Sequence, residues 1–145
     1  MRKVTKKILH CADTGVDQDF DIEDIRRWHT QGNGWSDIGY HYYIKLDGTV
    51  QIGRPVDKTG AHCRGENEDS IGICFEGGKK EDGSKWDKAT DAQEEAFFVL
   101  NYELDQDYGV TPCFGHYDFS NKSCPSFSVP ELMSRYFNRI GKGSR

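Results

Sequence analysis

The chain has 145 residues, of which 35% are hydrophobic and 12% aromatic, which is enough for one domain built around one core. A formal net charge of −5 argues against a broad nucleic-acid-binding surface. The sequence contains no apolar run of membrane length, and the basic N-terminus lacks the apolar core of a signal peptide. We therefore expect a monomer synthesised in the cytoplasm, with residues 1–145 forming a single domain that does not insert into a membrane.

The five cysteines cannot all pair with one another, and none lies in a CxxC motif. Reduced thiols, one of them a metal ligand, explain this pattern better than a disulfide framework. Cys11, Cys63, Cys74 and Cys113 mostly lie in or beside apolar runs, where cysteine behaves as a small hydrophobic residue. Cys124 is left as the candidate ligand.

The N-terminal segments predict a strand followed by a helix. Residues 7–11 (KILHC) have the composition of a short strand and place His10 near its end. Residues 21–31 (DIEDIRRWHTQ) have apolar residues at helical spacing, with Asp21 as an N-cap and glycines after the last turn. We expect His29, inside this helix, at the surface or the edge of the core rather than as a metal ligand.

A β-hairpin is the strongest local signal in the chain. Residues 40–45 (YHYYIK) and 49–53 (TVQIG) are aromatic and β-branched runs joined by an Asp-Gly turn. Because side chains alternate along a strand, Tyr40 and His41 point to opposite faces, so at most one of them can face a site. Periodicity does not choose between the two.

The middle of the chain predicts a buried strand and a long helix. Residues 70–75 (SIGICF) predict the strand, and residues 76–88, rich in Gly, Lys and Asp, predict an exposed loop without a function. Residues 90–108 predict the helix, which begins with a capping box formed by Thr90 and Gln93.

The C-terminal segments complete an alternation of strands and helices. Residues 110–115 (VTPCFG) predict a strand that delivers His116, and residues 129–140 predict a closing helix with Pro130 in its first turn. Neither an internal repeat nor a flexible linker divides the chain. The order of the elements predicts an α/β sandwich.

Residues 115–127 (GHYDFSNKSCPSF) contain the most informative group of polar side chains. Pro125 and the polar residues around it disfavour a helix or central strand, so His116 and Cys124 are expected on a loop that folds back on itself. Zinc binds imidazole and thiolate together, and a catalytic zinc site needs a third protein ligand. The alternative is a hydrogen-bonded strand-end histidine beside a buried free thiol.

Four motifs carry a resemblance to a known family. ILHCADT, GWSDIGYHYYIKLDGTVQIGR, GAHCRGENEDSIGICFEGG and GHYDFSNKSCPSF occur in the order found in zinc-dependent N-acetylmuramoyl-L-alanine amidases of the phage-lysozyme type. Animal peptidoglycan-recognition proteins look similar. The resemblance implies a central mixed β-sheet flanked by helices, with Zn²⁺ in a groove. It also implies hydrolysis of the amide bond between the lactyl group of muramic acid and L-alanine in bacterial peptidoglycan.

The same resemblance implies roles for individual residues. The motif tyrosine falls on Tyr40, which favours Tyr40 over His41 as the residue facing the site. Residues of the GAHCRGEN motif are expected along the substrate groove. The implied assignments are His10, His116 and Cys124 as zinc ligands, Tyr40 and Lys122 as catalytic residues, and His62 and Asn67 as substrate-binding residues.

Several alternatives remain open at this level. Either Tyr40 or Lys122 handles the proton, because the sequence offers no glutamate base in an HExxH motif. A second class of function is a peptidoglycan-binding module without catalysis, against which the presence of Cys124 with both histidines argues. A third class, a regulator that binds another protein, has no motif here. The resemblance otherwise implies a phage or prophage enzyme that acts on the cell wall after release.

Overall fold

The computed structural model describes residues 2–143 and has a five-stranded mixed sheet at its centre. The strand order is β4-β3-β5-β1-β7, in which β4 is antiparallel to β3 and the other neighbours are parallel. The expected mixed sheet is therefore confirmed. Its strands are β1 (Lys6–Cys11), β3 (Tyr42–Ile44), β4 (Val50–Ile52), β5 (Ser70–Phe75) and β7 (Cys113–Gly115).

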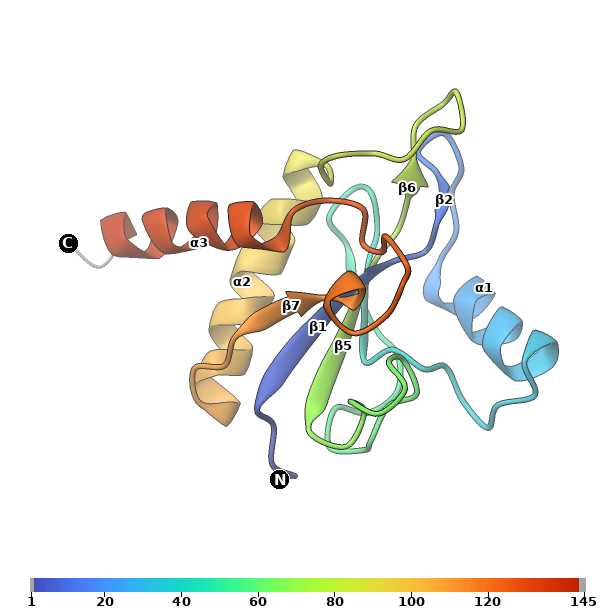
Figure 1. The fold of residues 1–145 in the computed structure, drawn as a ribbon, viewed down its shortest axis with the longest axis horizontal. Helices are drawn as coiled ribbons and strands as arrows, with labels where there is room; N and C mark the ends of the chain where they lie inside the picture. Colours follow the sequence, from blue (N-terminus) through green and yellow to red (C-terminus); the bar gives the residue numbers. More distant parts are fainter. Residues whose placement is uncertain (1, 144–145) are drawn as a thin grey trace.

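Helices cover both faces of the sheet (Figure 1). Helices α2 (Asp91–Tyr108) and α3 (Val129–Gly143) lie on one face, and α1 (Ile22–Arg27) lies on the other. Alternation along the strands divides the core between the two faces, so Leu9 packs on the α2 and α3 side while Cys74 packs with α1. Within residues 2–143, no helix has the length and apolar character needed to cross a membrane.

The predicted helix starts agree with the structure. The side chain of Asp21 caps α1 by accepting a hydrogen bond from the Asp24 amide, and Thr90 and Gln93 form the predicted capping box of α2. Helix α1 passes at Arg27 into a π-helical turn, Trp28–Gly32, which brings the predicted helical segment to its expected end. The side chain of Gln93 also donates to the Ile44 and Glu76 carbonyls at 3.0 and 2.8 Å, which ties α2 to the sheet.

Three predicted strands are shorter than expected. The hairpin strands begin after His41 and end at Ile52, so Tyr40 and His41 lie immediately before β3. Strand β7 covers only Cys113–Gly115, and Val110, which was expected to begin this strand, is 81% exposed.

The segment from residue 76 to residue 88 corrects the prediction of an exposed loop. Strand β6 (Gly78–Lys79) pairs with β2 (Thr14–Gly15), and Trp86 is only 4% exposed. The Trp86 indole donates a hydrogen bond of 2.8 Å to the Pro125 carbonyl. A single aromatic residue among polar residues has no periodicity, so its burial had no local signal. The segment supports the loop that carries Cys124.

A buried ion pair fixes β1 against α2. The Lys7 ammonium lies 2.6 Å from an Asp105 carboxylate oxygen and 3.2 Å from the Thr111 carbonyl. The side chains of Lys7 and Asp105 are 1% and 9% exposed, so this charged contact is inside the protein. It holds the strand whose far end reaches the site described next.

Candidate active site

Two neighbouring parallel strands deliver two histidines to the same edge of the sheet. Leu9 of β1 lies opposite Gly115 of β7, so the next residues, His10 and His116, lie side by side. Their ring centroids are 4.6 Å apart. His10 is buried and is the last residue but one of strand β1, whereas His116 begins a short 3-10 helix (His116–Asp118) and is half-buried.

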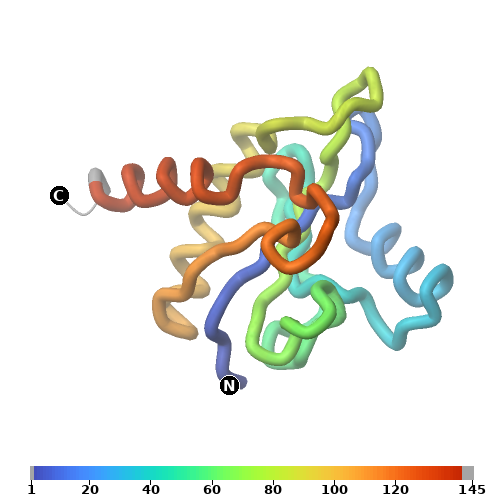
Figure 2. The backbone as a smooth tube through the Cα atoms, in the orientation of Figure 1, coloured from blue at the N-terminus to red at the C-terminus, as the bar shows by residue number. Residues whose placement is uncertain are grey.

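A loop after this 3-10 helix brings Cys124 to the two histidines. Figure 2 shows the orange segment after β7 curling back beside the end of β1. The Tyr117 amide donates to the Cys124 carbonyl at 2.9 Å, which closes the loop. The Cys11 amide donates to the Cys124 sulfur at 3.1 Å, so β1 itself holds the thiol in place. The sulfur is therefore positioned by backbone contacts.

These three side chains form a group that could hold a metal ion. The ligand atoms of His10, His116 and Cys124 all lie within 4.8 Å of one another. Tetrahedral zinc with nitrogen and sulfur ligands separates its ligand atoms by roughly 3.3–3.8 Å, so a small contraction would complete the geometry. Two imidazoles and a thiol match the donor types that zinc prefers. The described residues thus fit a three-ligand site with a fourth position left for water or substrate.

Local electrostatics keep both imidazoles in the form that binds metals. Burial, followed by the charges of His62 and His116, holds the pKa of His10 well below its usual range. Burial and the positive charge of Lys122 lower the pKa of His116. The hydrogen-bonding contact with Cys11 and burial raise the pKa of Cys124, so its thiolate needs a nearby cation at neutral pH.

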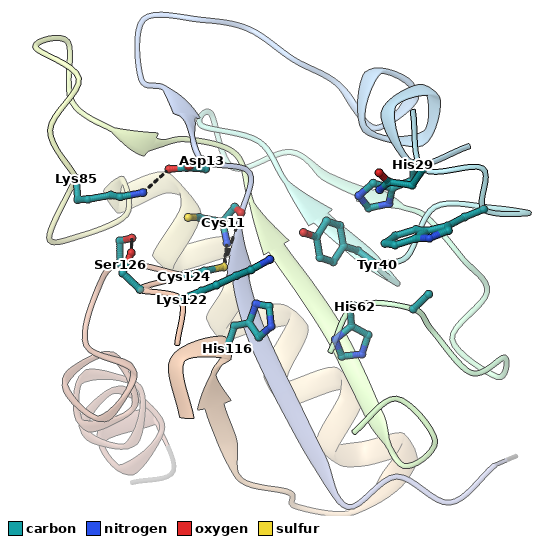
Figure 3. Close-up of a pocket in the computed structure, with 14 residues that line it drawn as sticks. Cys11, Asp13, His29, Tyr40, His62, Lys85, His116, Lys122, Cys124 and Ser126 are labelled. Carbon is teal, nitrogen blue, oxygen red and sulfur yellow. Dashed lines mark hydrogen bonds and ion pairs between the residues drawn. The ribbon is translucent and has the colours of Figure 1, made fainter. Parts of the chain in front are cut away.

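A cavity of about 560 Å³ opens in front of this group (Figure 3). A second groove of about 460 Å³ adjoins it and shares part of its wall. His116 and Lys122 line both spaces, so a long substrate could pass the metal group on two sides. The residues common to both walls are Trp35, Ala61, His62, His116 and Lys122.

Tyr40 and Lys122 face this cavity from opposite sides. The Tyr40 ring lies 5.0 Å from the His10 ring, and Figure 3 shows its hydroxyl and the Lys122 side chain extending towards the middle of the space. Burial raises the pKa of Tyr40 well above its usual range, so the hydroxyl is a hydrogen-bond donor at neutral pH. His41 is fully buried instead, where it accepts a hydrogen bond from the Gly72 amide.

The two residues expected along the substrate groove have different surroundings. His62 lines both spaces but is only 8% exposed, and its Nδ1 lies 2.9 Å from His10 Nε2. Asn67 lines the second groove, and its side-chain oxygen accepts hydrogen bonds from the His62 and Cys63 amides at 2.8 and 2.9 Å. Asn67 therefore shapes the loop that carries His62, and its amide nitrogen is the atom left for a ligand.

Sequence reasoning missed several residues of the cavity wall. His29 is half-buried, which agrees with the expected position at the edge of the core, and it packs against Trp35 and Tyr40 with ring-centroid distances of 4.7 and 5.2 Å. Its place in the cavity wall was not foreseen. Asp13 and Lys85 form a 2.8 Å ion pair at another part of the wall. Asp13 and Lys85 are 72 residues apart in the chain, and the contacts of His29 depend on side-chain orientation, so no local pattern identifies either.

Comparison with known proteins defines the class to which this fold and site belong. A family described as N-acetylmuramoyl-L-alanine amidase matches residues 1–127, which is most of the chain. The chain belongs to this family. The expectation of an amidase from the four sequence motifs is thereby confirmed.

Individual relatives agree with this membership. The endolysin of Klebsiella phage KP32 is 39% identical over 129 residues, covering 88% of this chain and 85% of the relative. The solved structure of the N-acetylmuramoyl-L-alanine amidase LysC from Clostridium intestinale URNW is similar with a TM-score of 0.79 and 31% identity, covering 92% of this chain and 85% of the other. Bumblebee PGRP-SA is similar with a TM-score of 0.72 and 28% identity, covering 86% and 77%.

Proposed function

We propose that this protein is a zinc-dependent endolysin that hydrolyses the amide bond between N-acetylmuramic acid and L-alanine in bacterial peptidoglycan. The observation that carries the proposal is the meeting of His10, His116 and Cys124, two of which, His116 and Cys124, line an open cavity, in a chain of the amidase family. Residues 1–145 act as one amidase domain, and the protein works as a monomer at the cell wall.

Zinc is the ion that best suits this donor set. Neutral imidazoles on His10 and His116 leave the charge of the Cys124 thiolate as the only negative charge from the ligands, so the site keeps a net positive charge. When bound, zinc supplies a Lewis acid for the scissile carbonyl and acidifies a water molecule to serve as the nucleophile.

Tyr40 and Lys122 stabilise the charge that develops during the reaction. Because Tyr40 keeps its proton at neutral pH, its hydroxyl acts as a hydrogen-bond donor to the carbonyl oxygen and not as a base. The Lys122 ammonium extends into the same cavity from the opposite wall and can donate a proton to the leaving amine of L-alanine. In this proposal the proton transfer is assigned to Lys122.

The adjoining spaces suit a branched polymer. We assign one to the glycan strand and the other to the peptide stem, since the scissile bond joins these two parts and must lie at the metal group between them. His62 and Asn67 belong to the wall on the side of the second groove. Binding across both spaces would position the amide for attack before any chemistry occurs.

End-group analysis of digested peptidoglycan tests this function. Digestion should release new L-alanine amino termini without new reducing sugar ends. Cys124→Ala should abolish this release, whereas Cys113→Ser should not, because Cys113 contacts Asn101 on the α2 side of the sheet. New reducing ends without new amino termini would show a glycosidase, and binding to peptidoglycan without either product would show a binding module.

A further inference from the structure

A chain of buried hydrogen bonds runs from the candidate metal ligand His10 into the core. His10 Nε2 lies 2.9 Å from His62 Nδ1, and the other ring nitrogen of His62 lies 3.1 Å from the Ser70 hydroxyl oxygen. His10 and Ser70 are 1% and 0% exposed, and His62 is 8% exposed. Water therefore has little access to these contacts, and the three groups must satisfy one another.

Two neutral imidazoles can share such a contact in only two ways. If His10 carries its proton on Nε2, it donates to His62 Nδ1, His62 Nε2 donates to Ser70, and His10 Nδ1 keeps a free lone pair. If the protons lie the other way, Ser70 donates to His62, His62 donates to His10, and His10 Nδ1 carries a hydrogen. Only the first arrangement leaves His10 with a nitrogen that can bind a cation.

The fold holds the His62 ring tightly in this position. A Cβ atom placed on Gly72 would lie 2.5 Å from His62 Cγ, and one on Gly60 would lie 2.8 Å from His62 Cδ2. Both positions therefore need glycine to make room for the ring. The Asn67 side chain fixes the backbone of the same loop through the His62 amide. This packing gives the His62 ring a defined orientation, unlike that of a mobile residue in a groove.

We propose that His62 is a positioning residue for the metal site: it accepts a hydrogen bond from His10 Nε2 and donates one to Ser70, which leaves the lone pair of His10 Nδ1 free to bind the ion. This role goes beyond lining the substrate groove and rests on the proposed zinc site. Groups behind a metal-bound histidine set its tautomer and its orientation, and their loss typically weakens metal binding by about 10- to 100-fold.

Zinc affinity measured by competition with a chromophoric chelator tests the role without substrate. His62→Leu should raise the zinc dissociation constant by about 10- to 100-fold, because it removes the acceptor for His10 Nε2. His62→Asn should stay within about threefold of the parent, since the Asn oxygen can take the place of Nδ1 as acceptor. Circular dichroism of each variant establishes that it is folded. Equal affinity of folded His62→Leu and the parent would overturn the proposal, because a residue that only binds substrate changes KM alone.

The tautomer of His10 gives a second readout that needs no variant. In the zinc-loaded parent, ¹⁵N NMR should show a protonated Nε2 on His10 and a metal-bound Nδ1. A proton on Nδ1, or zinc on Nε2, would overturn the proposal even if His62→Leu failed to fold. A parent that binds no zinc would refute the proposed function itself, whereas a zinc-binding parent with the wrong tautomer would refute only the role of His62.

Discussion

Replacing Asp105 with alanine is expected to destabilise the protein by about 3–5 kcal/mol, because it leaves a buried ammonium group without its counter-ion. The Lys7 side chain is 1% exposed and lies 2.6 Å from the Asp105 carboxylate. Lys7 now donates to the Asp105 carboxylate and to the Thr111 carbonyl. In the variant it would keep the Thr111 carbonyl, at 3.2 Å. For a chain of this length, the melting temperature should fall by about 10–15 °C.

Urea unfolding of the metal-free protein measures this effect without the contribution of a bound ion. Asp107→Ala is a matched control, because Asp107 lies on the same helix but is exposed. It should change the free energy of unfolding by less than about 0.5 kcal/mol. The double variant Lys7→Met with Asp105→Leu should recover most of the loss, since it removes both charges. A loss below about 1 kcal/mol for Asp105→Ala would refute the reasoning that the pair is desolvated.

Two further predictions concern the site and its surroundings. Tyr40→Phe and Lys122→Ala should each lower kcat by about 10²-fold while the zinc content stays unchanged. If either variant keeps a near-normal kcat, the residue replaced in it has a structural role only. Burial lowers the pKa of His41 from 6.5 to about 4, so the unfolded chain binds one more proton than the folded chain between these pH values. The free energy of unfolding of metal-free protein should therefore fall by about 3 kcal/mol through His41 as pH decreases from 6.5 to 4. His41→Gln should make this dependence less steep, although His10 and His62, whose pKa values burial also lowers, still contribute to it. An unchanged slope would contradict the assignment.

Local features of the fold were predictable because each has a signal within a few residues. The capping box of α2 needs only Thr90 and Gln93, and the buried strand β5 is a continuous apolar run. The burial of Trp86 was not predictable in this way. Its partner is the Pro125 carbonyl, which belongs to a loop almost forty residues further along the chain.

The candidate site depends on contacts that periodicity does not encode. Residues at the ends of two strands meet only when the strands are neighbours in the right register, and here Leu9 opposite Gly115 aligns His10 with His116. Motif resemblance supplied that pairing in advance, because the order of motifs reflects a shared fold. It placed His62 in the groove but did not reveal the 2.9 Å contact with His10, which depends on a side-chain orientation.

X-ray absorption spectroscopy at the zinc edge tests the central claim most directly. The protein should bind one zinc per chain, with a single sulfur neighbour at about 2.3 Å and two nitrogen neighbours at about 2.0 Å. In Cys124→Ser the sulfur contribution should disappear, whereas Cys113→Ser should have the spectrum of the parent. A parent spectrum without sulfur, or a sulfur signal that persists in Cys124→Ser, would contradict a site formed by His10, His116 and Cys124.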